Sequence, residues 1–315
     1  MIKIKIFALL ILFIILILKE YKKENFMQNK KIIVKFVDKM GYGNLSNYEL
    51  TKTIKNLNFT NDEKNNLIYS NNKLKKNDIV VYTYTSLNKY YKKASKNILL
   101  SRETPLIERK FYKQILNNLK KYDLILTTDK KLLDLNIPKI KLNLLNTTWL
   151  NPIDIKIHNK SKLCSFILSN KKKFIGHKLR YEIKKSIIKN NLKIDLFGGN
   201  SHHYKNKEDK IIFLRDYMFS ISIENIKSDY YFTEKLFDCL LTGTIPIYYG
   251  CPSLHKFFDK RGIINFDTKE ECIQIIKKLS VKKYKNMFPY IKKNFHTALN
   301  LIKQGRINEK YILDL

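Results

Sequence analysis

The chain has 315 residues, of which 61 are basic and 28 acidic, giving a formal net charge of +33. A hydrophobic content of 44%, with 18 Phe and 20 Tyr, argues against intrinsic disorder, and the length suffices for two core-forming domains. The basic excess suggests polyanion binding, but Arg, the residue that reads bases through bidentate contacts, is scarce. We therefore expect no nucleic-acid partner, although the charge should attract small anions and acidic membranes at low salt.

The amino terminus is strongly apolar. Residues 6–18 are apolar without interruption, and Ile2 and Ile4 extend the stretch to about seventeen apolar residues, the short end of a spanning helix. No small-residue cleavage site follows, so we predict an uncleaved, single-pass membrane anchor with its tether over 1–24 rather than a removed signal peptide. Lysines flank both ends of the stretch, so charge counting does not set its orientation.

Residues 25–145 show the alternation of strands and helices that is typical of a parallel α/β domain. Apolar runs predict strands at 31–37, 79–84, 98–100 and 123–127, and helical spacing is found at 108–121 and 130–135. The region 39–78 carries no pattern that we can interpret. The stretch from 136 lacks periodicity, and we place an interdomain linker at 146–160.

Residues 161–315 predict a second α/β domain. Strands are expected at 163–168, 194–197, 219–223 and 245–249, and helices at 178–189, 234–241, 270–278 and 285–303. Two such domains facing a cleft would form a GT-B-like architecture of two Rossmann-like domains.

The most informative segment is 219–252. An apolar strand ends in Glu224-Asn225, Thr233 is a candidate helix cap, and a second apolar strand follows Gly243. Ligands of open α/β sheets bind outside the carboxyl ends of the strands. We therefore expect a ligand site formed by the polar residues of this segment, which are Glu224, Asn225, Tyr231, Thr233, Glu234 and Lys235.

The same segment resembles the C-terminal signature of the alpha-1,3-fucosyltransferase family, glycosyltransferase family 10. The matching parts are Glu224-Asn225, the Tyr-x-Thr-Glu-Lys run that begins at Tyr231, and the Gly-x-x-Pro-x-Tyr-x-Gly run that begins at Gly243. The resemblance implies a GT-B enzyme that transfers L-fucose from GDP-fucose to a hydroxyl of an N-acetylglucosamine- or glucose-containing glycan with inversion. It also implies a type II, Golgi-like membrane arrangement.

Roles for the site residues follow from their chemistry and from this resemblance. We expect Lys235 to neutralise the diphosphate of the leaving GDP, and Glu234 to accept hydrogen bonds from ribose hydroxyls. The resemblance places a diphosphate-binding Arg at Arg180, which otherwise reads as a surface residue paired with Glu182. Asn225 and Tyr231 would position the nucleotide or the sugar. The remaining acid, Glu224, would either stabilise positive charge at the sugar carbon or orient a neighbouring base.

An inverting transferase needs a base that removes the proton of the acceptor hydroxyl. The resemblance places this base at Glu103, just past an apolar strand of the first domain, and Glu108 is the competing candidate. An alternative role for Glu103 is a salt bridge to Arg102 or a loop cap before Pro105.

No metal or tightly bound cofactor is expected. The four cysteines form no C-x-x-C pair, although their spacing allows a Cys251–Cys272 disulfide without requiring it. His202-His203 has no acid at ligand spacing. A D-x-D motif is absent, which favours catalysis by Lys and Arg without a divalent metal. Sequons occur at Asn44, Asn58 and Asn146, but an Asn-rich chain produces such matches by chance.

Two alternative functions remain open at this point. The first is a GT-B glycosyltransferase that uses another nucleotide sugar, because the fold defines the diphosphate site more firmly than the base or the sugar. The second is an inactive, membrane-tethered polyanion-binding protein, which the charge of +33 would suit.

Overall fold

The computed structural model describes residues 32–37, 67–70, 76, 78–83, 91–101, 109–198, 207–304 and 311. The predicted anchor at 1–24, the candidate bases Glu103 and Glu108, and His202-His203 lie outside these residues. Within the described part of the chain, no helix combines the length and apolar character needed to cross a bilayer.

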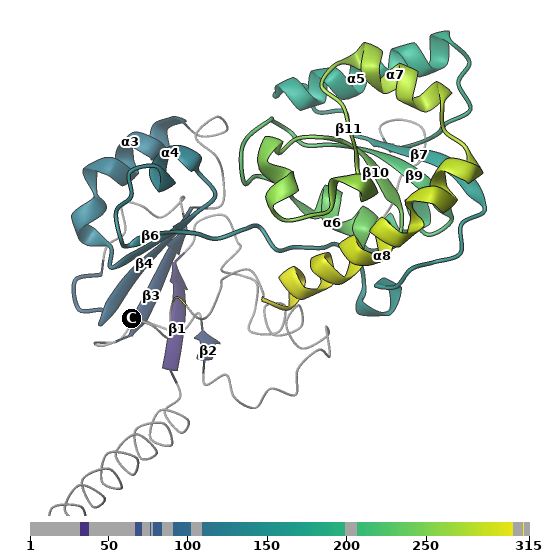
Figure 1. Cartoon of the computed structure of the whole chain (residues 1–315). Helices are drawn as coiled ribbons and strands as arrows, with labels where there is room; N and C mark the ends of the chain where they lie inside the picture. Colours follow the sequence, from purple (N-terminus) through teal and green to yellow (C-terminus); the bar gives the residue numbers. More distant parts are fainter. Residues whose placement is uncertain are drawn as a thin grey trace, which may run out of the picture.

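The N-terminal lobe is built on a parallel six-stranded sheet with the strand order β2-β1-β3-β4-β5-β6. Its strands are β1 (Ile32–Val37), β2 (Leu67–Ser70), β3 (Ile79–Thr83), β4 (Lys96–Ser101), β5 (Leu124–Thr127) and β6 (Ile140–Leu142). Figure 1 shows this sheet with the helices α3 (Arg109–Asn117) and α4 (Lys130–Leu133), between which lies the 3-10 turn η2 (Leu119–Lys121).

Both faces of β3, β4 and β5 are covered, which explains why these strands read as continuous apolar runs. On β3, Val80 and Tyr82 belong to a core that α3 and α4 complete, whereas Val81 faces a second core. Tyr311, near the end of the chain, packs against that second core. The carboxyl end of the chain therefore returns to the N-terminal lobe.

The C-terminal lobe contains a parallel five-stranded sheet with the order β11-β10-β9-β7-β8. Its strands are β7 (Lys162–Leu168), β8 (Asp195–Gly198), β9 (Tyr217–Ile223), β10 (Ile245–Tyr249) and β11 (Ile264–Asn265). Its helices are α5 (Ile175–Lys189), α6 (Glu234–Leu240), α7 (Lys269–Lys277) and α8 (Val281–Lys303). Short 3-10 turns complete the lobe: η3 (Pro152–Asp154), η4 (Lys207–Phe213), η5 (Pro252–Lys256) and η6 (Lys260–Gly262).

Helices cover both faces of this second sheet (Figure 1). Buried residues of α5, α7 and the first half of α8 form one core with the strands, and α6 packs with the second half of α8 in another. The strand order reverses direction between β7 and β9, because β8 lies on one side of β7 while β9, β10 and β11 extend on the other. Such a reversal is where open α/β sheets bind ligands.

Several element bounds differ from the expectations. Strands β2, β6 and β11 were not predicted, since each has four residues or fewer and none shows a sustained pattern. The helix expected at 108–121 is divided into α3 and η2, and α5 begins at Ile175 rather than 178. The four cysteines are free and buried, so the Cys251–Cys272 disulfide does not form.

Candidate functional site

The candidate site lies where the strand order reverses, at the carboxyl ends of β7 and β9. The start of α5, which follows β7, contacts the residues that follow β9: Gly176 N–H donates to the backbone oxygen of Asn225 over 3.0 Å. A Cβ atom at Gly176 would lie 1.8 Å from the backbone oxygen of Glu224. Because real Cβ atoms do not approach so closely, glycine is required at this position.

Arg180 lies one turn further along α5 and is 6% exposed. Its guanidinium donates hydrogen bonds to the backbone oxygen of Ile223 and, over 3.2 Å, to Asn225 Oδ1. Burial lowers the pKa of Arg180, and the nearby carboxylates of Glu224 and Glu234 oppose that shift. Arg180 is therefore a buried cation at the end of β9, not a surface residue paired with Glu182.

Thr233 caps α6 and joins it to the end of β9. Its backbone N–H and its hydroxyl both donate to Glu224 Oε1, over 2.8 and 3.0 Å, and the backbone N–H of Lys235 donates to the Thr233 hydroxyl over 3.4 Å. The Glu224 carboxylate is fully buried. The hydrogen bonds from Thr233 hold this carboxylate in place, so Glu224 fixes the position of the loop that leads into α6.

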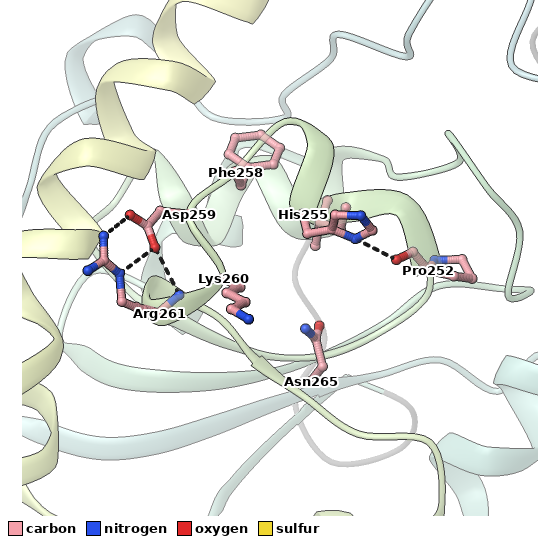
Figure 2. A pocket seen from close by; sticks show the side chains of 8 residues that line it. Pro252, His255, Phe258, Asp259, Lys260, Arg261 and Asn265 are labelled. Carbon is pink, nitrogen blue, oxygen red and sulfur yellow. Dashed lines mark hydrogen bonds and ion pairs between the residues drawn. The ribbon is translucent and has the colours of Figure 1, made fainter.

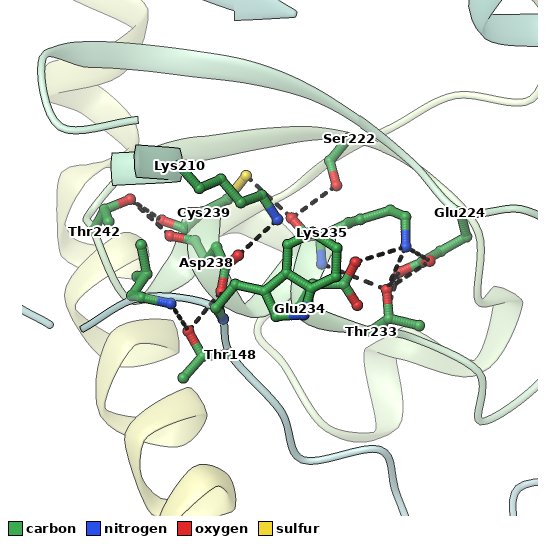
Figure 3. A network of polar contacts seen from close by, with 12 residues as sticks. Thr148, Lys210, Ser222, Glu224, Thr233, Glu234, Lys235, Asp238, Cys239 and Thr242 are labelled. Atoms are coloured by element: carbon green, nitrogen blue, oxygen red, sulfur yellow. Dashed lines mark hydrogen bonds and ion pairs between the residues drawn. The ribbon is translucent and has the colours of Figure 1, made fainter. Parts of the chain in front are cut away.

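Lys235 completes a compact group of charges (Figure 3). Its ammonium lies 2.9 Å from Thr233 Oγ1, 3.0 Å from Glu234 Oε1 and 3.4 Å from Glu224 Oε2, with 24% of its side chain exposed. Burial alone would lower the pKa of Lys235, but the two carboxylates raise it above its ordinary value. In this group the protonated amine of Lys235 is partly exposed, and the carboxylate of Glu224 that pairs with it is buried.

Glu234 is nearly buried and ionised. Burial alone would raise its pKa, but the ammonium groups of Lys235 and Lys210 outweigh that effect and lower the pKa to about 2. Its neighbour Tyr231 is 3% exposed and packs with Leu145 of the segment between the lobes. All six residues expected from the segment 219–252, together with Arg180, thus lie in one region of the structure.

Three contributors were not predicted from the sequence. Lys210 donates to Asp238 Oδ2 over 2.7 Å, and both side chains are at least nine-tenths buried. Burial raises the pKa of Asp238, and the Lys210 ammonium, which lowers it, only partly offsets this effect. His177, 4% exposed on α5, accepts from Phe174 N–H through Nδ1 over 3.2 Å. No local pattern identifies Lys210 in a chain with 61 basic residues.

The two lobes approach each other beside this site. On α4, Lys130 pairs with Asp134 over 2.5 Å, which is the largest cause of its raised pKa, and Asp229 and Tyr230 of the opposite lobe add to it. The candidate base Glu103 lies outside the described residues, so its distance from this region is not defined. Among the described residues, no cluster of three His, Cys, Asp or Glu side chains could hold a metal ion.

An open cavity of about 640 Å³ is lined by Asn265 of β11 and by residues of the segment that joins β10 to β11 (Figure 2). Within its charged lining, Asp259 binds Arg261 through two side-chain contacts of 2.9 and 2.7 Å. None of its lining residues belongs to the group described above; they are Pro252, Leu254, His255, Phe258, Asp259, Lys260, Arg261 and Asn265.

Two α/β lobes, each built on a parallel sheet, form an architecture of the GT-B-like class. Residues 157–306 match the family model described as glycosyltransferase family 10 (fucosyltransferase) C-term. This part of the chain is a domain of that family.

Individual proteins to which the chain is similar are also named as fucosyltransferases or fucosyltransferase-like proteins. The chain is 26% identical over 159 residues to a putative fucosyltransferase-like protein of Arabidopsis thaliana, covering 50% of this chain and 29% of that protein. It is 38% identical over 95 residues to alpha-(1,3)-fucosyltransferase FucT of Helicobacter pylori, covering 27% and 19%. The chain therefore spans less than a third of these two curated relatives.

A solved structure shares this fold over most of the chain. The crystal structure of an alpha1,3-fucosyltransferase with GDP-fucose superposes with a TM-score of 0.55 at 18% identity, covering 88% of this chain and 91% of that one. At this identity the likeness shows the fold.

Proposed function

We propose that the protein is a fucosyltransferase that uses GDP-fucose as its donor. The observation that carries this proposal is the position of Lys235 in a family 10 domain. Its partly exposed ammonium is paired with Glu224, which directly follows Ile223, the last residue of β9, whose backbone oxygen binds Arg180. Two cations in a partly desolvated site stabilise the charge that develops on a departing diphosphate. The GDP-fucose complex of the solved fucosyltransferase with the same fold supports this choice of donor.

The reaction would be a single displacement with inversion. An oxygen of the acceptor attacks the anomeric carbon of fucose, the bond from that carbon to the phosphate oxygen breaks, and GDP leaves with the electron pair. Glu103 takes the proton of the acceptor hydroxyl. Lys235 and Arg180 bind the diphosphate, and Glu234 accepts hydrogen bonds from the ribose.

Glu224 acts in this scheme through its neighbours. Because it is fully buried and bound to Thr233 and Lys235, it positions the lysine and does not reach the sugar. Asn225 is held by Arg180 and by Gly176, and Tyr231 by apolar packing, so both are ordered before a ligand arrives. The acceptor we propose is a glycan containing N-acetylglucosamine or glucose, modified through an alpha-1,3 linkage. We also propose that 1–24 anchors the enzyme to a membrane as a type II protein and that no divalent metal is required.

The full chain, purified in detergent, tests this proposal with GDP-fucose and a panel of lactosamine and lactose acceptors. Release of GDP that depends on an acceptor, and stronger competition by GDP than by UDP, are the expected results. The absence of GDP release with every acceptor, together with no calorimetric binding of GDP, would contradict the proposal. Stronger competition by UDP would instead indicate another nucleotide sugar.

A further inference from the structure

The open cavity of Figure 2 is connected to the candidate site through one short loop. Its wall contains η5, and the backbone N–H of Tyr230 donates to Ser253 Oγ of that turn over 3.1 Å. The ring of Tyr230 also packs edge-on against that of Phe257, which directly follows η5. Tyr230 is the neighbour of Tyr231 in the candidate site, so the cavity lies on a different part of the same lobe.

The charge that this cavity offers to a ligand is positive. Its acidic lining residue, Asp259, is only 7% exposed and already accepts from the Arg261 guanidinium over 2.9 and 2.7 Å and from the Lys293 ammonium over 3.2 Å. Lys260 is exposed and forms no ion pair within the part of the chain that the structure describes. A ligand in the cavity would therefore meet an ammonium group without a counter-ion, which favours an anion.

Two further polar side chains lie beside this cation. In Figure 2 the ammonium of Lys260 and the amide of Asn265 point toward one another, with the ring of His255 above them. His255 Nδ1 lies 3.3 Å from Pro252 O. Because a carbonyl oxygen only accepts, Nδ1 carries the proton, and Nε2 of the neutral ring is an acceptor. An amide that donates and accepts, together with an imidazole acceptor, suits the hydroxyl groups of a ligand.

The size of the cavity indicates a ligand larger than a simple anion. Its volume of about 640 Å³ lies within the roughly 300–1,000 Å³ that is usual for sites of small organic molecules. Pro252, Leu254 and Phe258 add apolar surface to the lining. The lining thus suits a molecule with one anionic group, several hydroxyls and apolar C–H faces, and a sugar acid or a sugar phosphate has this composition.

We propose that this cavity binds a sugar that carries an anionic group, either a carboxylate or a phosphate. The Lys260 ammonium pairs with the anion, and Asn265 and His255 form hydrogen bonds with the hydroxyls. The site is separate from the donor site and does not depend on the proposed function.

Saturation-transfer NMR on the full chain in detergent at low salt tests the proposal with glucose, glucuronate and glucose 6-phosphate. We expect at least one of the two anionic sugars to bind roughly fivefold to tenfold more tightly than glucose. A preference for glucuronate would identify the anion as a carboxylate, and a preference for glucose 6-phosphate would identify it as a phosphate; either result supports the proposal.

Variants at exposed positions assign this binding to the cavity. Lys260→Met should reduce the affinity for the anionic sugar to that for glucose, and Asn265→Ala should weaken the binding of every sugar. Lys277→Met, at an exposed lysine on α7, is the control and should bind as the wild type does. GDP affinity and the melting temperature should be unchanged in all three variants, which separates the cavity from the donor site and from a structural role.

Equal affinity of the wild type for glucose and for both anionic sugars would overturn the inference, as would wild-type sugar binding by Lys260→Met. Displacement of the bound sugar by inorganic phosphate at the concentration at which glucose 6-phosphate displaces it would show anion binding without sugar recognition, and would also overturn it. Displacement by GDP would place the sugar in the donor site instead. Failure of the wild type to bind GDP contradicts the proposed function alone, because the readout here is sugar binding.

Discussion

The ammonium of Lys235 and the carboxylate of Glu224 lie 3.4 Å apart, and the carboxylate is fully buried. A buried anion is costly unless it is paired and hydrogen-bonded, and here Thr233 and Lys235 provide both. The pairing holds the lysine side chain in one direction before any ligand is present. The cation at the candidate site is therefore preorganised.

Replacing the guanidinium of Arg180 by an amine should weaken GDP binding and lower stability. Arg180→Lys retains the charge but loses the planar guanidinium, whose Nη2 donates both to Ile223 O and to Asn225 Oδ1. We expect GDP affinity to fall about tenfold or more and the melting temperature to decrease, as calorimetry and thermal unfolding would record. Arg215→Lys, a half-exposed arginine paired with Asp216, is the matched control and should leave both quantities unchanged. Equal behaviour of the two variants would show that the guanidinium of Arg180 is unimportant for binding and stability.

The close approach of α5 to the end of β9 should make Gly176 intolerant of a side chain. In Gly176→Ala the new Cβ would meet the backbone oxygen of Glu224 at 1.8 Å, so α5 or the loop must shift. We expect a loss of about 1–3 kcal/mol in the free energy of unfolding and a lower affinity for GDP. Denaturant unfolding gives the first quantity. Lys178→Ala, exposed on the same helix, should change it by less than about 0.5 kcal/mol.

The ionised state of Glu234 should make the fold sensitive to acid. Its folded pKa of about 2 lies below the ordinary 4.5, so its contribution to stability is present above pH 4.5 and is lost as the pH falls toward 2. For a single group the slope is at most about 1.4 kcal/mol per pH unit. Urea unfolding between pH 3 and pH 6 should therefore show a shallower pH dependence for Glu234→Gln than for the wild type. Parallel curves for the two proteins would be inconsistent with this pairing.

The buried pair of Lys210 and Asp238 should behave as a unit. Removing one partner, in Lys210→Met or Asp238→Asn, leaves the other charge buried without compensation, at a cost of about 3–5 kcal/mol. The double variant should recover part of this loss, and a double-mutant cycle measures the coupling free energy. The exposed pair of Lys269 and Glu270 is a control for which the coupling should be below about 1 kcal/mol. Additive effects at the buried pair would exclude the coupling.

The parts of the fold that were predicted well are those with a local pattern. Strand β10 has the expected bounds, because a strand covered on both faces is a single apolar run. The cap at Thr233 was also predicted, and the structure confirms that its side chain accepts from Lys235 N–H. The first turn of α5 was missed because Gly176 lowers helix propensity, whereas the contact that requires glycine there is tertiary.

The parts of the site that were missed depend on contacts between distant residues. Lys210 and Asp238 are 28 residues apart, and one lysine among many carries no signal of burial. The sequence could identify the residues of the segment 219–252 because they are close in the chain and match a family signature.

The central claim is that the Lys235 ammonium binds the diphosphate of the donor. Its most direct test is GDP binding by Lys235→Met, which keeps the length of the side chain and removes the charge. Lys269→Met, at a partly exposed lysine on α7, is the control. We predict that calorimetry with the full chain will show at least tenfold weaker GDP binding for Lys235→Met and unchanged binding for Lys269→Met. Wild-type affinity for GDP in Lys235→Met would contradict the claim.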